Sequence, residues 1–209
     1  MTQQTYMYPG TNVLRNKLNI QDKEELEQAE KYFTLKRMVE LYNSRRVSGS
    51  FNREHIQAVH YHIFQDLYEW AGEWRTVQIQ KGSTNFLATS FLHIGLSDLE
   101  KRLLKLNAGG FKTKEAFAEA AAVIYTDLNY IHPFREGNGR TQREFIRQLA
   151  LYHGFEMDYI DERREKLFEA SVVDDYTMAK EALLAIIKND AVDIALKERI
   201  RYNNEEENS

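Results

Sequence analysis

One stretch of twelve residues combines the side chains and glycines that phosphate chemistry requires. It reads His132-Pro-Phe-Arg-Glu-Gly-Asn-Gly-Arg-Thr-Gln-Arg143. Gly137 and Gly139 permit backbone conformations that a Cβ would penalise, so main-chain N–H groups can point at an anion. From about Arg140 the sequence turns helical, and a helix N-terminus favours phosphate through its free N–H groups and its dipole. The stretch therefore predicts a phosphate-binding loop.

The charged residues of this loop indicate what kind of phosphate it would hold. Arg140 and Arg143 are three residues apart in the first helical turn and could grip two phosphates of one polyphosphate. Glu136 is a hard oxygen ligand, and Mg²⁺ is typically held by one or two carboxylates plus substrate phosphates. His132, just before a proline that should end the preceding helix, is a candidate proton acceptor. The alternative is an ordinary helix connection with a structural histidine.

The pattern His-x-Phe-x-(Asp/Glu)-Gly-Asn-Gly-Arg-x-x-Arg resembles the active-site motif of the Fic family, enzymes that transfer AMP from ATP to protein hydroxyls. All eight specified positions are present: His132, Phe134, Glu136, Gly137, Asn138, Gly139, Arg140 and Arg143. Relatives that have drifted to phosphorylation are altered in the second half of the motif. That half is intact here, which favours nucleotidyl transfer.

The resemblance implies a role for each motif residue, with ATP and Mg²⁺ as the ligands. His132 would be the general base on the target hydroxyl, and Glu136 the Mg²⁺ ligand. Gly137 to Gly139 would form the anion hole, Arg140 and Arg143 would hold the β- and γ-phosphates, and Phe134 would anchor the loop in the core. The expected nucleotide-binding set is Ile79, Gln80, Lys81, Gly82, Glu136, Gly137, Asn138, Gly139, Arg140, Thr141, Gln142 and Arg143.

A change of hydrophobic period predicts a β-hairpin over about residues 75–87. Val77 and Ile79 alternate with polar residues, and the segment 81–85 supplies turn residues. A lone hairpin is marginally stable, so it must lie on helices. In the Fic family a hairpin here, the flap, docks the target peptide by strand addition. The resemblance implies that Lys81 and Phe86 contact the target; a plain hairpin is the alternative.

The remaining elements are helices that would position the loop. Apolar periodicity and stop signals predict helices over about 22–41, 53–69, 92–106, 113–131, 140–153 and 163–175, with one or two more over 177–200. Asp22 and Thr113 are expected N-caps, and Gly154 a helix stop. The expected fold is all-α with one hairpin, as a single domain over residues 1–200. The segment 1–20, which resembles the opening of bacterial Fic proteins, would form a strap, and the polar tail 201–209 would be frayed.

Composition limits the possible partners and the location. The chain has 209 residues, 28 Lys and Arg against 32 Asp and Glu, and no cysteine. The net charge of −4 gives no sign of a nucleic-acid or membrane surface. No apolar run approaches the roughly 18–20 residues of a membrane span, and the N-terminus lacks a signal-peptide pattern. We expect a bacterial cytoplasmic protein, and translocation into a host cell by a dedicated secretion system stays open.

Control of the activity is the last expectation. Fic proteins are commonly silenced by a helix carrying (Ser/Thr)-x-x-x-Glu-(Gly/Asn), and the two partial matches, at Ser50–Glu54 and Thr177–Glu181, lack the final Gly or Asn. We therefore expect a separate antitoxin-like protein that places a Glu on Arg143. The three histidines of the second predicted helix, His55, His60 and His62, are expected to be structural rather than metal ligands.

Some functional alternatives remain open at this point. The transferred group could be UMP or phosphocholine, or the chain could be a non-catalytic nucleotide- or peptide-binding module, which would need neither His132 nor Glu136. By resemblance the targets would be DNA gyrase and topoisomerase IV subunits for a toxin, or host small GTPases for an effector. Family placement puts the adenine pocket near Phe168 to Tyr176.

Overall fold

The computed structural model describes residues 6–44, 49–81, 84–158, 161–173 and 175–207. Within them it contains eight α-helices and one two-stranded antiparallel sheet, so the predicted all-α fold with one hairpin is confirmed. The elements are α1 (Lys23–Ser44), α2 (Arg53–Phe64), β1 (Gln80–Lys81), β2 (Thr84–Asn85), the 3-10 helix η2 (Thr89–Phe91), α3 (Leu92–Ala108), α4 (Lys114–Ile131), α5 (Asn138–Tyr152), α6 (Asp161–Val173), α7 (Tyr176–Ile186) and α8 (Ile194–Glu207).

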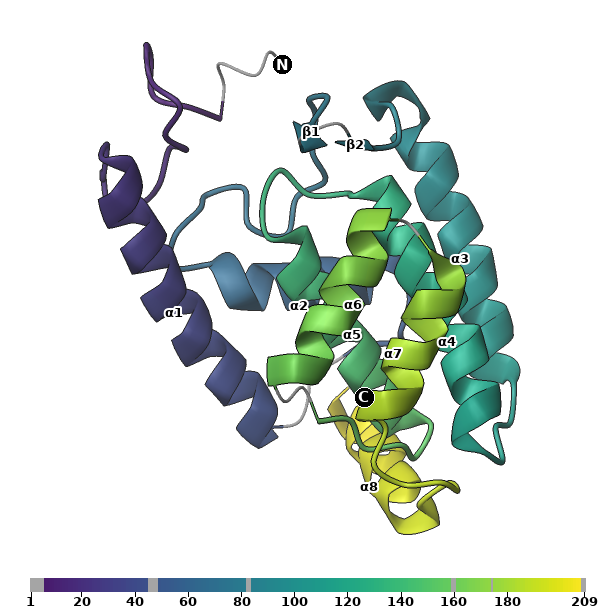
Figure 1. The fold of residues 1–209 in the computed structure, drawn as a ribbon. Coiled ribbons are helices and arrows are strands. Elements are labelled where there is room, and N and C mark those ends of the chain that lie inside the picture. The colour runs from purple at the N-terminus through teal and green to yellow at the C-terminus, as the bar shows by residue number, and fades with distance from the viewer. Residues whose placement is uncertain (1–5, 45–48, 82–83, 159–160, 174, 208–209) are drawn as a thin grey trace.

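Helix α5 lies near the centre of the fold, with the other helices around it (Figure 1). It packs against α2, α4 and α8, while α4 also packs against α3 and α7. Helix α1 covers the α2 side of the molecule, and the hairpin lies at the end where α4 finishes and α5 begins (Figure 1). The loop between these two helices is therefore held by the most enclosed part of the structure.

Local capping explains most of the helix ends that the sequence predicts. The Asp22 carboxylate accepts a hydrogen bond of 2.9 Å from the Glu25 N–H, and the Thr113 hydroxyl accepts one of 3.4 Å from the Ala116 N–H. Such caps satisfy N–H groups that have no intrahelical acceptor. After α5, Gly154 adopts φ +84°, a left-handed conformation that ends helices. These three predicted ends are confirmed.

Two helix boundaries differ from the prediction. Helix α2 ends at Phe64 rather than near Glu69, because the chain turns back and the Gly72 N–H donates to His60 Nδ1 at 2.8 Å. Leu67 is still fully buried, so the hydrophobic period marks burial beyond the end of the helix. Helix α8 continues through Glu207, so the tail predicted to fray from Arg201 is helical up to that residue. Its 14 residues contain no Gly or Pro, the two strongest helix breakers.

The hairpin is shorter than the predicted segment 75–87. Each strand has two residues, paired as Gln80 with Asn85 and Lys81 with Thr84. Val77 and Ile79, whose alternation predicts the hairpin, are both buried and both precede the first strand. The side chains of the packed segment, rather than its short ladder, fix the hairpin on the helices.

Two large hydrophobic clusters and a small third one between α5 and α8 form the core of the described residues, and the predicted active-site loop lies where the two large ones meet. The larger cluster contains the inner faces of α3 to α7 and includes Phe134. The second contains residues of α2, the turns after it and the hairpin, including Ile79 and Phe86. The N-terminal segment joins the second cluster through Tyr6, whose hydroxyl lies 3.2 Å from the Thr76 hydroxyl. In the part of the chain that is described, no helix combines the length and the apolar character needed to cross a bilayer.

Candidate active site

A pocket of about 590 Å³ opens beneath the hairpin, at the junction of α4 and α5. Its walls are the hairpin, the end of α4, the loop and first turns of α5, and one face of α6. The lining residues are Ile79, Gln80, Lys81, Thr84, Phe86, Tyr125, Asn129, His132, Arg135, Glu136, Gly137, Asn138, Gly139, Arg140, Gln142, Arg143, Phe168, Ser171 and Val172. Seven of the eight motif residues line this one pocket, and the eighth, Phe134, is buried.

The candidate base, His132, is held in an unusual conformation at the end of α4. Its backbone is left-handed (φ +45°, ψ +62°), which is uncommon for a residue other than glycine. Its N–H donates to the Leu128 carbonyl at 2.9 Å, and its ring Nδ1 lies 3.1 Å from the Asn129 carbonyl oxygen. Since a carbonyl only accepts, Nδ1 carries the proton, and Nε2 is the nitrogen that can take one.

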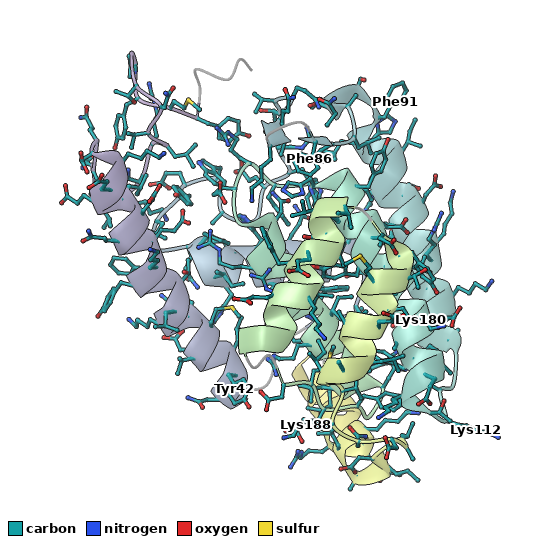
Figure 2. The ribbon with its side chains drawn as sticks, viewed as in Figure 1. Tyr42, Phe86, Phe91, Lys112, Lys180 and Lys188 are labelled. Atoms are coloured by element: carbon teal, nitrogen blue, oxygen red, sulfur yellow. The ribbon has the colours of Figure 1, made fainter. Side chains whose placement is uncertain are left out.

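The surroundings of His132 keep its ring neutral. Phe86 stacks on the imidazole with ring centroids 3.6 Å apart and an angle of 15° between the planes. Figure 2 labels Phe86 just below the hairpin, on the side that faces the helices. Burial, opposed by the hydrogen bond to Asn129 and assisted by the charges of Arg75 and Lys81, lowers the pKa of His132 to about 4. At neutral pH the imidazole is therefore an unprotonated base.

The loop backbone is fixed by three buried side chains, those of Asn138, Phe134 and His60. The Asn138 amide donates to the Phe134 carbonyl and accepts from the Phe134 N–H, both at 2.8 Å. Phe134 stacks on His60 with centroids 3.9 Å apart, and His60 Nε2 lies 3.0 Å from the Glu136 carbonyl. Burial lowers the pKa of His60 to about 3, so this ring is a neutral support. His60 is thus structural, as predicted.

Gly137 is the residue that brings the loop to the N-terminus of α5. It has φ +79°, and a Cβ built on it would lie 2.1 Å from the Phe64 ring. Neither the conformation nor the space suits another residue. The first N–H groups of an α-helix have no intrahelical acceptor, so the turn from Asn138 presents free donors and the positive end of the helix dipole to the pocket.

The two arginines of the motif both line the pocket, and Arg140 is clamped by another helix. Arg140 Nη2 donates to a Glu30 carboxylate oxygen of α1 at 2.6 Å. The second Glu30 oxygen accepts from the Tyr68 hydroxyl at 2.5 Å. The Arg140 guanidinium also lies 4.7 Å above the Phe64 ring, a cation–π distance. Arg140 is therefore preorganised by partners that the motif does not contain.

Glu136 has the chemistry and the place for one Mg²⁺ ligand. Its side chain is 45 % exposed and lines the pocket. One of its oxygens accepts from the Gly137 N–H at 2.8 Å and lies 3.6 Å from Arg140 Nη2. Among the described residues no three His, Cys, Asp or Glu side chains cluster to hold a metal by themselves. A single carboxylate beside a phosphate cradle fits a cation that takes its other ligands from phosphates and water.

Some of the other residues predicted to bind the nucleotide line the pocket, and some do not. Ile79, Gln80 and Lys81 line the pocket, whereas Gly82 lies outside the described residues. Thr141 is buried and turns its hydroxyl to the Gly137 carbonyl at 3.1 Å, so its side chain does not reach the pocket.

Gln142 does line the pocket, although its side-chain amide also donates a hydrogen bond to the Tyr125 carbonyl. Within the segment predicted to bind adenine, Phe168, Ser171 and Val172 line the pocket. Tyr176 does not: its hydroxyl donates to the Glu119 carbonyl at 3.3 Å. Lys81 of the hairpin extends over the Phe168 ring, with its nitrogen 5.6 Å from the ring centroid, so hairpin and α6 approach each other across the pocket.

Comparison with known proteins agrees with the geometry. The model of the Fic/DOC family matches residues 50–150. The chain is 40 % identical over 152 residues to a probable protein adenylyltransferase, y4lH, from Sinorhizobium fredii, an alignment that covers 72 % of this chain and 77 % of the relative. It is 33 % identical over 196 residues to the protein adenylyltransferase VbhT of Bartonella schoenbuchensis, covering 93 % of this chain and 40 % of the relative.

A solved structure resembles the fold over nearly its whole length. The crystal structure of BepC, a VirB-translocated effector protein from Bartonella tribocorum with bound AMPPNP, superposes with a TM-score of 0.74 at 27 % sequence identity. The match covers 90 % of this chain and 98 % of that one. A nucleotide is thus bound by a protein of the same fold.

Proposed function

The chain belongs to the Fic/DOC family, and from this premise we propose that it is a protein adenylyltransferase that moves AMP from ATP to a Ser, Thr or Tyr hydroxyl of a target protein. The observation that carries the proposal is the meeting of the His132 imidazole and the N-terminus of α5 in one pocket. A neutral base and a polyphosphate cradle on opposite sides of a reacting phosphorus suit an in-line transfer.

The proposed reaction uses the chain's own groups as follows. His132 Nε2 takes the proton of the target hydroxyl as its oxygen bonds to the α-phosphorus, and the bond from that phosphorus to the β-phosphate bridge breaks. The departing pyrophosphate carries charge toward the free N–H groups of α5, Arg140 and Arg143. A Mg²⁺ ion held by Glu136 and the phosphates would neutralise part of that charge.

The hairpin suits a protein substrate. Within the part of the chain that the structure describes, its strands pair only with each other, so one edge of each keeps backbone groups that an extended peptide can bond. Gln80 and Lys81 are exposed on this hairpin and also line the pocket. A target strand added at this edge would bring its hydroxyl near Phe86 and His132.

A labelling assay tests the proposed reaction. The purified chain is incubated with Mg²⁺ and ATP labelled at either the α- or the γ-phosphate, alone and with bacterial lysate. Protein-bound label from the α-phosphate alone is expected. Label from the γ-phosphate would indicate phosphorylation instead. No label from ATP, with label from UTP carrying the isotope at its α-phosphate, would indicate another donor.

Substitution of the base is the matched test. His132→Ala should lower transfer by about 10²-fold or more, since general-base catalysis is typically worth 10²–10⁴-fold, while AMPPNP binding stays close to that of the original protein. His93→Ala is the control, because His93 is exposed on α3. Transfer by His132→Ala at the original rate would refute the assigned role.

We also propose that inhibition comes from a separate antitoxin-like chain that places a Glu on Arg143. The two segments that partly match the inhibitory pattern do not line the pocket: Glu54 pairs with Arg53 at 2.9 Å, and Glu181 is exposed on α7. The chain expressed alone in bacteria should therefore slow growth. An inert lone protein that becomes active in Glu54→Gly or Glu181→Gly would show that the inhibitor is internal.

A further inference from the structure

Arg75 is a fully buried cation that the proposed reaction does not use. Its side chain is 2 % exposed and burial lowers the pKa of its guanidinium, which nevertheless stays charged. A guanidinium has five N–H donors, and the structure provides five acceptors: Nε donates to the His132 carbonyl at 2.8 Å, Nη1 to the Val77 carbonyl at 2.9 Å and the Thr89 hydroxyl at 2.8 Å, and Nη2 to the Leu87 carbonyl at 2.5 Å and the Ile131 carbonyl at 3.3 Å.

These acceptors belong to three places that are distant in sequence. Val77 precedes the first strand of the hairpin, Leu87 and Thr89 follow the second, and Ile131 and His132 end α4. In addition, the Arg75 N–H donates to the Pro133 carbonyl at 2.8 Å. One side chain therefore joins both arms of the hairpin to the backbone of the candidate base.

The position of Arg75 at the end of α4 explains how the structure tolerates a buried charge. None of the five acceptors is a carboxylate. The last carbonyls of a helix have no intrahelical donors and form the negative end of its dipole, so a cation there is favourable. The guanidinium donates to carbonyls at the helix end that would otherwise have no hydrogen-bond donor.

Phe86 lies directly between two of these anchored points. It precedes Leu87, whose carbonyl Arg75 holds, and its ring stacks on His132, whose carbonyl Arg75 also holds. Without the guanidinium, the hydrogen bonds that connect the Leu87 carbonyl, just after the hairpin, to the His132 carbonyl through one side chain would be lost. The stacked pair therefore lies between two backbone carbonyls that accept hydrogen bonds from the same side chain.

We propose that Arg75 is a positioning residue that sets the hairpin over His132 and so fixes the Phe86 stack. The consequence for target docking on the hairpin rests on the proposed function, whereas the positioning itself does not. A purely structural Arg75 would contribute to folding, and its loss would leave the environment of His132 unchanged in molecules that remain folded.

The Arg75→Lys substitution tests the hydrogen bonds of the guanidinium separately from its positive charge, because lysine keeps the charge and removes the planar set of five donors. Lysine has three donors on one nitrogen, so it cannot replace five hydrogen bonds that leave from three separate nitrogens. The hairpin should loosen, Phe86 should leave the imidazole, and water should reach the ring. The other charged groups that line the pocket with His132 are Lys81 on the hairpin, Arg135 and Glu136 in the loop, and Arg140 and Arg143 on α5. The groups of the loop and of α5 should stay in place. Lys81 should move with the hairpin, and the loss of its positive charge beside the ring should also favour protonation of His132.

The experiment is a titration of the histidine side chains by ¹⁵N NMR on the full chain, with His132→Ala used for assignment. We expect the original His132 to remain neutral down to about pH 5 and Arg75→Lys to bind the proton at least about tenfold more strongly. Phe86→Ala should have a similar effect, and adding it to Arg75→Lys should give little further change. Arg102→Lys is the control, since Arg102 is a 54 % exposed surface residue.

Each outcome decides the question. A folded Arg75→Lys protein with the original His132 titration would overturn the proposal, as would a fully additive double variant. If Arg75→Lys does not fold, Thr89→Val removes one acceptor, and an unchanged His132 titration there would overturn it equally. Because the titration needs no turnover, it can succeed even if the chain proves to transfer nothing.

Discussion

Replacing Gly137 by alanine should be the most damaging single-methyl change in the active-site loop. The residue has φ +79°, and an alanine in the left-handed region costs about 1–2 kcal/mol. The new Cβ would also lie 2.1, 2.3 and 3.0 Å from three atoms of the Phe64 ring. Overpacking of this kind costs about 1–3 kcal/mol, so Gly137→Ala should destabilise the protein by roughly 2–5 kcal/mol.

Gly139→Ala provides a control two residues away in the same motif. Gly139 lies within α5, and a Cβ there would meet only the tip of Arg143, at 3.3 Å. Alanine is about 1 kcal/mol better than glycine inside a helix, so this variant should be unchanged or slightly more stable. Urea denaturation of both variants measures the difference, which should be about 2 kcal/mol or more.

A second substitution separates the clash from the backbone strain. Phe64→Leu in the Gly137→Ala background makes room for the methyl group, so the double variant should be more stable than the sum of the two single changes predicts. The strain of about 1–2 kcal/mol should remain. If Gly137→Ala matched Gly139→Ala within about 0.5 kcal/mol, the argument from conformation and contact would be refuted.

Three further outcomes follow from the charges. Glu30→Gln should lower the free energy of unfolding by about 1–3 kcal/mol, because Glu30 accepts from Arg140 and Tyr68; Glu27→Gln, with Glu27 59 % exposed, should change it by less than about 0.5 kcal/mol in the same urea experiment. With a His132 pKa of about 4, kcat/KM for transfer should be level above about pH 5 and fall as the pH drops through 4; an acid limb near pH 6.5 would contradict this. The pKa of His60 is about 3 in the folded chain and 6.5 in the unfolded chain, so between these values only the unfolded chain binds the proton. The free energy of unfolding should therefore fall below pH 6.5 by up to about 1.4 kcal/mol per pH unit. The urea midpoint of a His60→Gln variant should depend less steeply on pH than that of the original protein, and an equal slope would contradict the assigned pKa of His60.

The sequence predicts the shape of the loop over residues 132–143 because the rules that govern it are local. Twelve consecutive residues contain the candidate base, the candidate Mg²⁺ ligand and the helix N-terminus, and local rules for glycine, proline and helix ends suffice to arrange them. The helix caps at Asp22 and Thr113 are predicted for the same reason. The end of α2 is missed because burial continues through Leu67 and Trp70 after the helix stops. The hydrophobic periodicity of a sequence indicates which residues are buried. Here the turns after α2 bury their apolar residues as a continued helix would, so the periodicity does not show where the helix ends.

The residues that hold the loop are missed because they are far away in sequence. Glu30 lies 110 positions from Arg140, and Arg75 lies 57 positions from His132. Neither has a local signal: Glu30 is one of several acidic residues in α1, and Arg75 precedes an ordinary apolar alternation. Only the packing of α1 and of the hairpin against the α4–α5 junction shows that these two side chains face the motif.

The two arginines show opposite solutions to the same electrostatic problem. Arg75 lies at the negative end of α4, where four backbone carbonyls and the Thr89 hydroxyl accept its donors without a carboxylate. Arg140 lies at the positive end of α5, where a cation is unfavourable unless an anion is near. Glu30 at 2.6 Å and Glu136 at 3.6 Å supply that anion. If the chain binds ATP as we propose, the phosphates must compete with these carboxylates for Arg140. Substitutions of Glu30 on α1 should then change the affinity for ATP, although Glu30 lies outside the motif.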